Sequence, residues 1–423
     1  MLRRTIVKKI IFMLPVLASA AGFQILEQNV TYLGQSYSGT ASSLDNATAT
    51  FYNPAGIVFT KGWQFSYSNA FILPQTKYTL SNQVTVAGTG VGTFGTEEEA
   101  ENKLIPIPQL FLTKDFGSKL AFGFSVNSPF GLSTEYDQNS AVAYAAQKSS
   151  LQTINFSPNF AYKVTDSLSV AAGVDYSLGR LILSKKSPSA GGSFLLENKL
   201  NGNGLGWHLG AFYRANQYDL GFRFHSTIEY NMDGDVFPTS LGDKVSTKLN
   251  SPEFYVGSLN YHLSDRSDIL FDAQFTNWDR IDTIVLDYTG GSLASALASA
   301  ESKRTMREFF DSSWRFALGY KQQFSDAMTI RFGVAYDQTP VIDEERGPAL
   351  PDGNRTWVSL GLSSKIGTST FDLGYAFINM QDQTLDYRSI PSTDTNAVST
   401  VNVKGAWHSH VHLFGLQWNA EWK

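Results

Sequence analysis

The chain has no cysteine, little excess of either charge, and no long apolar run after its first twenty residues. Without cysteine, disulfide frameworks and thiol chemistry are excluded, so packing and backbone hydrogen bonds must stabilise the fold. Lysine and arginine total 33 against 38 acidic residues, which gives a formal charge of -5. Because no basic cluster follows the first nine residues, this balance disfavours nucleic acid or another polyanion as a partner.

Beyond residue 20, no stretch approaches the roughly 18 consecutive apolar residues that a membrane-spanning helix needs. A helical membrane protein is therefore excluded. The chain is nevertheless rich in aromatic residues, with 30 Phe, 19 Tyr and 8 Trp among 423 residues. This aromatic content needs another explanation.

The first twenty residues have the three parts of a secretory signal. Four cations among the first nine residues precede the apolar segment 10–17, and Ala18, Ser19 and Ala20 form a small-residue cleavage site. We expect residues 1–20 to be a signal peptide and the mature chain to begin at Ala21.

Alternation of apolar and polar residues with a period of two is the main pattern of the remaining chain. Successive side chains of a strand point to opposite faces, so alternation predicts a strand with one apolar face. The segments LSVAAGVDYSL (168–178), YDLGFRFHSTIEY (218–230) and MTIRFGVAYD (328–337) all show it. Their polar faces carry glycine and alanine beside charged residues, which favours an enclosed, partly filled interior over the solvated face of a β-sandwich or propeller.

Fourteen such segments follow residue 61, and the connections between them alternate between tight turns and longer loops. They begin near residues 62, 105, 119, 151, 168, 203, 217, 251, 268, 312, 328, 354, 370 and 410. An even number of strands, with short turns on one side and long loops on the other, is typical of outer-membrane barrels. We predict an all-β fold, a fourteen-stranded antiparallel transmembrane barrel over residues 62–423. The loops 137–150 and 291–310 are expected to be helical.

Residues 21–61 precede the first strand and show no alternation. A fourteen-stranded barrel is wide enough to hold a water-filled lumen unless a segment fills it, so this segment is predicted to be a plug. Inward glycines at 173, 221, 319, 333 and 374 would leave room for its backbone. Within it, Asn53, Pro54 and Ala55 form a rigid turn, read either as a gating element or as a turn that only leads into the first strand.

The start of the predicted mature chain, AGFQILEQNV…YNPAGIVF, together with VNSPFGLSTEYD, LQTINFSPNFAYKVTDSLSVAAGV and LPDGNRTWVSLG, resembles the outer-membrane long-chain fatty-acid and hydrocarbon transporter family of the FadL/TodX type. The resemblance extends over essentially the whole chain. It implies a fourteen-stranded barrel with a luminal hatch. It also implies passive uptake of hydrophobic molecules that bind first at extracellular loops and leave sideways through the wall at a kink in the third strand.

The resemblance also implies site residues. Arg180 matches a basic position near the ligand carboxylate, whereas a second basic position is matched by Asp311, with Lys303, Arg304 and Arg307 nearby. Gly123 and Pro129 are candidates for the lateral opening, although Pro129 is also explained as a residue that ends a strand. The hatch turn is the implied gate, and Leu293 and Leu297 are candidates for capture of ligand by a loop.

Other functions are weaker alternatives. A lipase would need a serine nucleophile with a positioned histidine, and the chain has no G-x-S-x-G and only six histidines. His408, His410 and His412 share one strand face but are not expected to converge on one metal ion. We expect no enzyme activity, no cofactor and no metal, and hydrophobic small molecules as ligands. The expected surroundings are outer-membrane lipid and lipopolysaccharide around a monomer, with uptake of aromatic or alkane hydrocarbons, or an adhesin without transport, as the alternatives.

Overall fold

The computed structural model describes residues 22–422 apart from 82–83, 87–88, 92–94, 96, 118, 190–191, 282, 297–302, 308–309 and 389–400. The predicted signal peptide and Ala21 lie outside the described residues. No helix in the described ranges is both long enough and apolar enough to cross a membrane.

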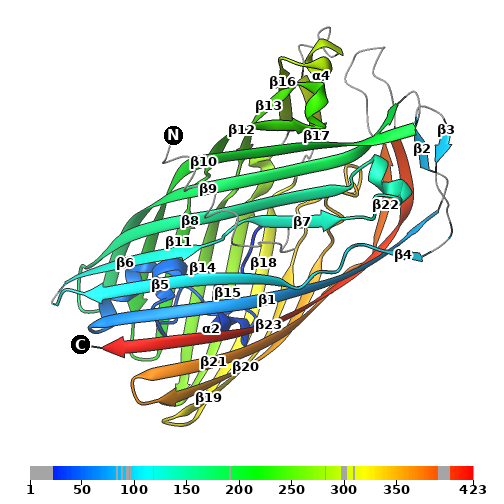
Figure 1. Ribbon diagram of the computed structural model, residues 1–423. Coiled ribbons are helices and arrows are strands. Elements are labelled where there is room, and N and C mark those ends of the chain that lie inside the picture. Colours follow the sequence, from blue (N-terminus) through cyan, green and yellow to red (C-terminus); the bar gives the residue numbers. More distant parts are fainter. Residues whose placement is uncertain are drawn as a thin grey trace.

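Fourteen antiparallel wall strands close into a barrel, as predicted (Figure 1). The first seven wall strands are β1 (Trp63–Leu80), β5 (Ile105–Asp115), β6 (Leu120–Asn127) continued by β7 (Gly131–Glu135), β8 (Lys148–Lys163), β9 (Leu168–Ser189), β10 (Gly192–Arg214) and β11 (Tyr218–His225) continued by β12 (Glu229–Phe237).

The second seven wall strands are β13 (Lys244–Asn250) continued by β14 (Glu253–Ser264), β15 (Ser267–Asn277) continued by β16 (Thr283–Thr289), β17 (Lys303–Arg307) continued by β18 (Ser313–Ser325), β19 (Met328–Asp337), β20 (Arg355–Ile366), β21 (Ser369–Met380) continued by β22 (Gln383–Arg388), and β23 (Val401–Trp422). The barrel closes where β1 pairs with β23, from Trp63 opposite Trp422 to Leu80 opposite Gly405. This closure joins the first wall strand to the last, so neither of these two strands is left as a free edge in lipid.

The remaining elements are short. They are β2 (Val84–Val86), β3 (Thr89–Val91), β4 (Glu97–Glu99), the α-helices α2 (Val30–Leu33), α3 (Ala49–Tyr52) and α4 (Ser292–Ala296), and the 3-10 helices η1 (Pro54–Phe59), η2 (Ala141–Tyr144), η3 (Thr239–Leu241) and η4 (Trp278–Arg280).

Among the described residues, the predicted helical loops are only partly helical. In loop 137–150 the helix is the single turn η2, and in loop 291–310 it is the five-residue α4. The expectation of a helix is wrong for Lys303–Arg307, because this segment forms β17 and pairs with β16. Four predicted strand starts are also late by seven residues or more, since β10 begins at Gly192, β13 at Lys244, β17 at Lys303 and β23 at Val401. Strands β10 and β23 are long, with 23 and 22 residues (Figure 1).

The alternation predicts the two faces of the wall correctly along β9. Val174 and Tyr176 are exposed on the outside, whereas Ser169, Asp175 and Ser177 are buried inside. The same interpretation fails at the end of the segment 218–230, because β11 ends at residue 225 and β12 begins at residue 229 with its own alternation. The residues at 228 and 230, predicted to face outward, are therefore buried in the interior.

A band of aromatic rings crosses five neighbouring strands on the outside of the wall. Ring centroids lie 4.9 Å apart between Trp207 and Phe224, 4.9 Å between Phe224 and Tyr255, 6.3 Å between Tyr255 and Phe275, and 5.1 Å between Phe275 and Trp314. Aromatic girdles of this kind lie at membrane–water interfaces. They account for part of the aromatic content of the chain.

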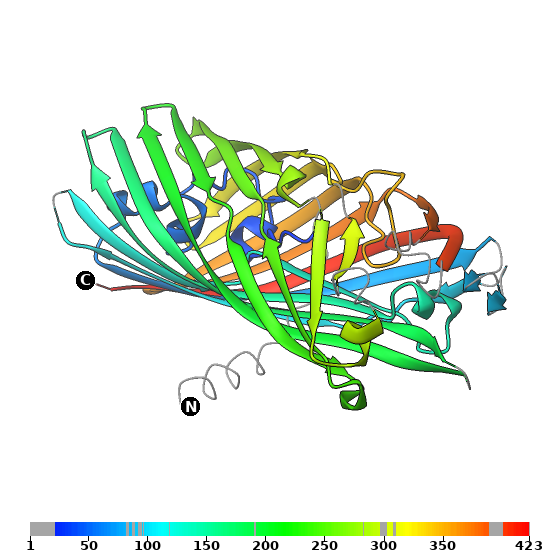
Figure 2. The same cartoon turned by 90° about the horizontal axis from the view of Figure 1, so that it is seen from above.

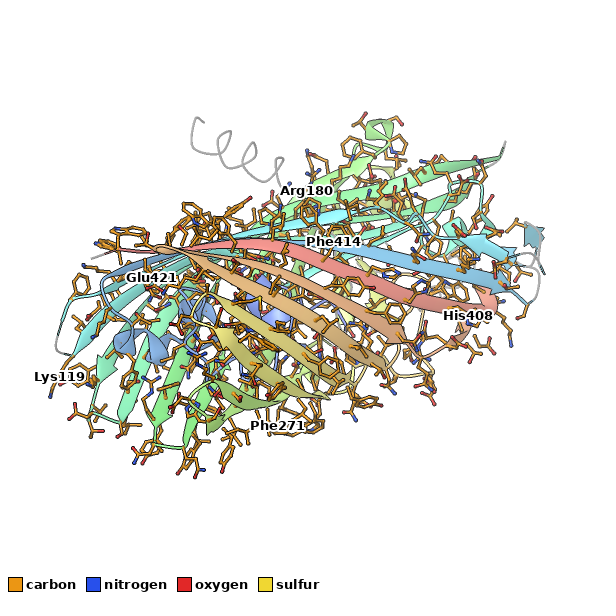
Figure 3. All side chains as sticks on the ribbon, turned by 90° about the horizontal axis from the view of Figure 1, so that it is seen from below. Lys119, Arg180, Phe271, His408, Phe414 and Glu421 are labelled. Atoms are coloured by element: carbon orange, nitrogen blue, oxygen red, sulfur yellow. The ribbon has the colours of Figure 1, made fainter. Side chains whose placement is uncertain are left out.

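The segment from Gly22 to Thr60 lies inside the barrel, toward the end that carries the short turns and the C-terminus (Figure 2). Lys119 and Glu421 mark this end in Figure 3, and His408 marks the opposite one. The segment, called the hatch below, contains α2, α3 and η1, which have only four to six residues each. Helices this short are not stable alone, so contacts with the wall must hold them.

Candidate functional site: the hatch and the broken third strand

Glycines on the inner face of the wall let the hatch backbone approach closely. A Cβ at Gly221 would lie 1.8 Å from the carbonyl oxygen of Ala41, and one at Gly333 would lie 2.1 Å from the carbonyl carbon of Gln35. Gly319 and Gly374 likewise face hatch atoms. Any larger residue at these positions would push the hatch from the wall. The fifth predicted glycine, Gly173, faces the side chain of a wall histidine instead.

Charged wall residues hold the hatch from several sides. Arg315 donates from Nη2 to the carbonyl of Ser36 at 2.7 Å, and both carboxylate oxygens of Asp272 lie 3.1 Å from the backbone nitrogen of Thr40. Arg223 donates to the carbonyl of Phe51 at 3.2 Å. Hydrogen bonds with one charged partner are stronger than neutral ones, so these contacts fix the position of the hatch.

Asp45 forms the main ion pair between hatch and wall. Its carboxylate lies 3.4 Å from Nζ of Lys321 and 3.6 Å from Nη2 of Arg331. Burial alone would raise the pKa of Asp45, but the charges of Lys321 and Arg331 outweigh burial and hold this pKa below its usual value. The seated hatch therefore favours the ionised form of this carboxylate.

The Asn53-Pro54-Ala55 turn is fastened by one side chain. Nδ2 of Asn53 donates to the carbonyl of Ala41 at 2.7 Å and to the carbonyl of Ala211 on β10 at 2.9 Å. Its Oδ1 accepts from the backbone nitrogen of Ala55 at 3.1 Å and so caps η1, in which Pro54 takes the first position. The turn is thus bound both to the hatch and to the wall.

The third wall strand is broken at Ser128, Pro129 and Phe130, between β6 and β7. Opposite this break, β8 has one residue fewer, since Asn127 pairs with Asn155 and Gly131 with Gln152. The extra residue makes a bulge, which bends the strand. Among the described residues, β7 pairs with β8 alone, whereas β6 pairs with both β5 and β8. The ladder between the second and third wall strands therefore stops at the break.

The start of the hatch pairs with the broken strand. The backbone nitrogen of Ile25 donates to the carbonyl of Pro129, and that of Gly131 donates to the carbonyl of Phe23, both at 2.8 Å. Gln24 and Phe130 are the antiparallel partners between these bonds. The beginning of the hatch thus satisfies backbone groups that the wall leaves unpaired at the break.

The first described residue is fastened to the opposite side of the lumen. The backbone nitrogen of Gly22 donates to Oδ2 of Asp352 at 2.8 Å, and Asp352 pairs through its other oxygen with Nη2 of Arg355. Gly22 has a φ of 61°, and a Cβ there would lie 2.7 Å from the ring of Trp278. Glycine is therefore required at this position for both conformation and space.

A packed apolar cluster, called the chamber below, surrounds the start of the hatch. The ring of Phe23 lies 4.9 Å from that of Trp278, 6.1 Å from Phe130 and 6.5 Å from Phe310. Further buried members come from several wall strands: Leu151, Leu181, Leu196, Leu200, Tyr230, Met232, Val236, Val245, Leu249 and Leu286. Leu293 on α4 packs against this cluster from the loop side. The loop, the chamber and the break are contiguous through Phe23 and Phe130.

The candidates at the third strand lie in different settings. Pro129 lies within the break, and its carbonyl meets the hatch. Gly123 lies below the break, where it pairs with Thr113 on β5 and Asn159 on β8, and a Cβ there would lie 2.0 Å from Oγ1 of Thr50. The absence of a side chain at Gly123 therefore lets the hatch lie close to the wall.

The head-group and capture candidates are scattered. Arg180 lies on β9 between Gln152 and Asn201, on the outward face shared with Tyr176 (Figure 3). Asp311 is exposed just before β18. Leu297 lies outside the described residues. The contact between Asp352 and Gly22 was not foreseen, because 330 residues separate the two and no local pattern marks it.

The three histidines near the C-terminus lie on the outward face of β23. His408 pairs with Asp382 at 2.8 Å, and Nδ1 of His412 lies 2.9 Å from the hydroxyl of Tyr375. The rings of His410 and His412 are 5.5 Å apart. They belong to the outer surface of the barrel.

The fold and the site define a membrane β-barrel whose lumen is filled by its own N-terminal segment, with an apolar chamber beside a break in the wall. The family model described as outer membrane protein transport protein (OMPP1/FadL/TodX) matches residues 11–422. The chain belongs to this family. It is an outer-membrane transporter of hydrophobic substrates.

Relatives and solved structures agree with this assignment. Outer membrane protein P1 of Haemophilus influenzae is 25% identical over 452 residues, covering 95% of each chain. The long-chain fatty acid transport protein of Escherichia coli (strain K12) is 25% identical over 416 residues, 86% of this chain and 89% of the relative. A Pseudomonas aeruginosa FadL homologue has a TM-score of 0.83 at 20% identity, covering 95% of this chain and 100% of the other. The toluene transporter TodX of Pseudomonas putida has a TM-score of 0.68 at 16% identity, covering 94% and 99%. At these identities the structural matches establish the fold alone.

Proposed function

We propose that the protein takes up long-chain fatty acids passively, by loop capture, movement of the hatch and lateral release through the break in the third wall strand. The relatives named as long-chain fatty acid transport proteins favour this ligand class. Uptake of aromatic or alkane hydrocarbons by the same route is the alternative, favoured by the fold shared with toluene transporters.

One observation carries the proposal: the start of the hatch pairs with the wall at the break. A ligand in the chamber contacts the ring of Phe23, whose backbone carbonyl accepts from Gly131. An apolar ligand that takes the place of this ring removes the packing that holds residues 23–25 in position. Movement of these three residues frees the backbone groups of the third strand and leaves the ladder open beside β5.

The driving force is burial of apolar surface. An alkyl chain gains roughly 0.8 kcal/mol for each CH₂ group removed from water. The chamber offers aliphatic and aromatic surface in place of water, and the break opens toward lipid, so the chain of a fatty acid stays out of water from capture to release. No energy source beyond this gradient is required.

Recognition of a carboxylate is proposed for Arg355 in preference to Arg180. Arg355 is 1% exposed and lines a cavity on the loop side of the hatch. Only Nη2 of its guanidinium bonds to Asp352, whereas Nε and Nη1 have no hydrogen-bond partner among the described residues. Apolar side chains of Leu350, Met380 and Val411 line the same cavity. Glu101 and Glu135 line it as well, and their charges are paired with Lys103 and Lys148. A buried guanidinium with unused donors beside aliphatic surface matches an amphipathic carboxylic acid.

Two measurements test the function. Organic extraction of the detergent-purified protein should yield fatty acids, and a strain lacking the protein should lose uptake of labelled oleate. If the strain lacking the protein lost uptake of labelled toluene or alkane but kept uptake of oleate, the hydrocarbon alternative would be favoured. An unchanged uptake of all of them, with no extracted ligand, would contradict transport and favour an adhesin.

A further inference from the structure

Three side chains with metal-ligating atoms meet on the inner face of the wall, outside the proposed passage. Asp175, His208 and His225 come from the neighbouring strands β9, β10 and β11, and the two histidines are direct partners in the ladder. Oδ2 of Asp175 lies 2.9 Å from Nδ1 of His208 and 3.6 Å from Nδ1 of His225. One ligand atom from each residue lies within 4.8 Å of the other two.

Neighbouring residues make room for the three side chains of this cluster and orient them. Gly173, opposite His208 on β9, leaves room for the imidazole, because a Cβ there would lie 2.2 Å from Nε2 of His208. Ser157 donates to the second oxygen of Asp175 at 2.5 Å and so orients the carboxylate. The imidazoles of His208 and His225 stack at 4.9 Å. The histidines and Asp175 are at least nine-tenths buried.

From this geometry we infer that Asp175, His208 and His225 form a binding site for a divalent transition-metal ion of the zinc class. Zinc bonds of about 2.0–2.1 Å to nitrogen and oxygen in a tetrahedron place ligand atoms roughly 3.3 Å apart. The two aspartate–histidine separations lie on either side of this value. A rotation of the imidazoles brings both Nδ1 atoms onto one ion, and water completes the coordination, as in zinc sites with three protein ligands.

The donor set selects the kind of metal. Two imidazoles and one carboxylate suit zinc or copper(II), whereas calcium and magnesium prefer oxygen ligands alone. Ser157 supplies the hydrogen bond that ligating carboxylates usually have from a neighbouring group. Arg223, two residues from His225, opposes a cation by its charge. Its guanidinium is engaged by the carbonyl of Phe51 and by the rings of Phe51 and Phe254.

The site connects the wall to the hatch. The ring of His225 lies 5.7 Å from that of Phe51 on α3 and 4.8 Å from that of Phe254 on β14. A bound ion fixes the imidazole against which Phe51 packs, and Phe51 directly precedes the segment that leads into the Asn53 turn. Occupation of the site by metal therefore stiffens the contact between hatch and wall and slows uptake.

The test uses the full-length protein without a histidine tag, folded in detergent with excess zinc chloride and then desalted. We expect one retained zinc per chain. His225→Gln and His208→Gln each lower zinc affinity at least tenfold, which is the usual effect of removing a ligand or its support. The variant His408→Gln, His410→Gln, His412→Gln serves as the matched control, because these three histidines lie on the outside of the barrel. It retains the ion.

A second measurement needs no change in the buried cluster. X-ray absorption at the zinc edge of the control variant should give two imidazoles and oxygen ligands at about 2.0–2.1 Å. Folding of each variant is checked by its heat-dependent gel shift. Any of three results would overturn the inference. The folded wild type does not retain zinc, or the control variant loses zinc while His225→Gln retains it, or the zinc spectrum shows no imidazole ligand.

Discussion

The backbone nitrogen of Gly22 donates to Oδ2 of Asp352 at 2.8 Å, across 330 residues of chain. This bond fixes the start of the hatch on the side of the lumen that faces away from the break. Together with the bonds to Pro129 and Gly131, it holds the first residues of the hatch between two points of the wall. In the proposed mechanism, a ligand in the chamber touches this start of the hatch.

Asp352→Asn should loosen this attachment. The charge-assisted bond to Gly22 is replaced by a weaker neutral one, and the buried Arg355 loses its ion pair. We expect faster amide hydrogen exchange for residues 22–26, by tenfold or more, measured by mass spectrometry of the folded protein. Asp326→Asn is the control, since this exposed side chain pairs with Arg266 at a tight turn. Equal exchange in both variants would contradict the role of Asp352.

Substitution of Gly333 should displace the hatch without removing the barrel. In Gly333→Ala the new Cβ lies 2.1 Å from the backbone of Gln35, so the hatch must shift, whereas Gly257→Ala meets no atom within 4 Å. The barrel closes through β1 and β23 in both variants. We expect ion conductance in planar bilayers to rise severalfold for Gly333→Ala and to stay at the wild-type value for Gly257→Ala. Similar conductance of the two variants would be inconsistent with a tightly fitted hatch.

Glu27 should make the seating of the hatch depend on pH. Complete burial raises its pKa from 4.5 to about 7, and the nearby charges of Arg355 and Arg315 only partly oppose this effect. A raised pKa means that the seated hatch binds the proton more tightly than the released one. Seating is therefore most stable below pH 4.5 and weakens as the pH rises toward 7, by a total on the order of 3 kcal/mol.

The variant Glu27→Gln isolates this effect. It keeps the size of the side chain and removes the titration, so protection of residues 22–30 from hydrogen exchange should change less between pH 4.5 and 7 than in the wild type, after correction for the intrinsic exchange rate. If the wild type and the variant showed the same pH dependence, other groups would be responsible for it.

Arg355→Gln should separate charged from uncharged ligands. Loss of the guanidinium removes the donors for a carboxylate and leaves the aliphatic lining of the cavity, so oleate binding falls about tenfold or more while binding of the corresponding fatty alcohol changes little. Titration calorimetry in detergent measures both. Arg180→Gln is the matched comparison, and a loss of oleate binding in this variant alone would return the head-group site to Arg180.

The wall was largely predictable from the sequence, because alternation with a period of two is a local signal. The faces of β9 and the number of wall strands follow from it directly. It fails where a strand is interrupted, as at Ser226–Ile228, because an interruption restarts the alternation and leaves no mark in the composition. Long-range partners are the other gap. The family resemblance implies that Arg180 lies near the ligand carboxylate. The alternation that predicts an outward Tyr176, however, also places Arg180 on the outward face.

The plug was predictable from what it lacks, namely alternation and long helices. Its fastening was not, because Asn53 bonds to Ala211 and Gly22 to Asp352 through contacts that depend on the closed barrel. The buried cluster of Asp175, His208 and His225 was likewise hidden. Its members are polar residues on three separate strands, and only the register between the strands brings them together.

The most direct test is to lock the start of the hatch to the broken strand. Gln24 and Phe130 form an antiparallel pair flanked by the two bonds to Pro129 and Gly131, so their Cα atoms lie at the close spacing that suits a disulfide. Because the chain has no cysteine, Gln24→Cys with Phe130→Cys gives a single defined bridge. We predict that uptake of labelled oleate stops when the bridge is oxidised and returns on reduction, whereas each single variant is indifferent to oxidant. Uptake at the same rate in the oxidised and reduced double variant would contradict the claim that the hatch start must leave the break for a ligand to pass.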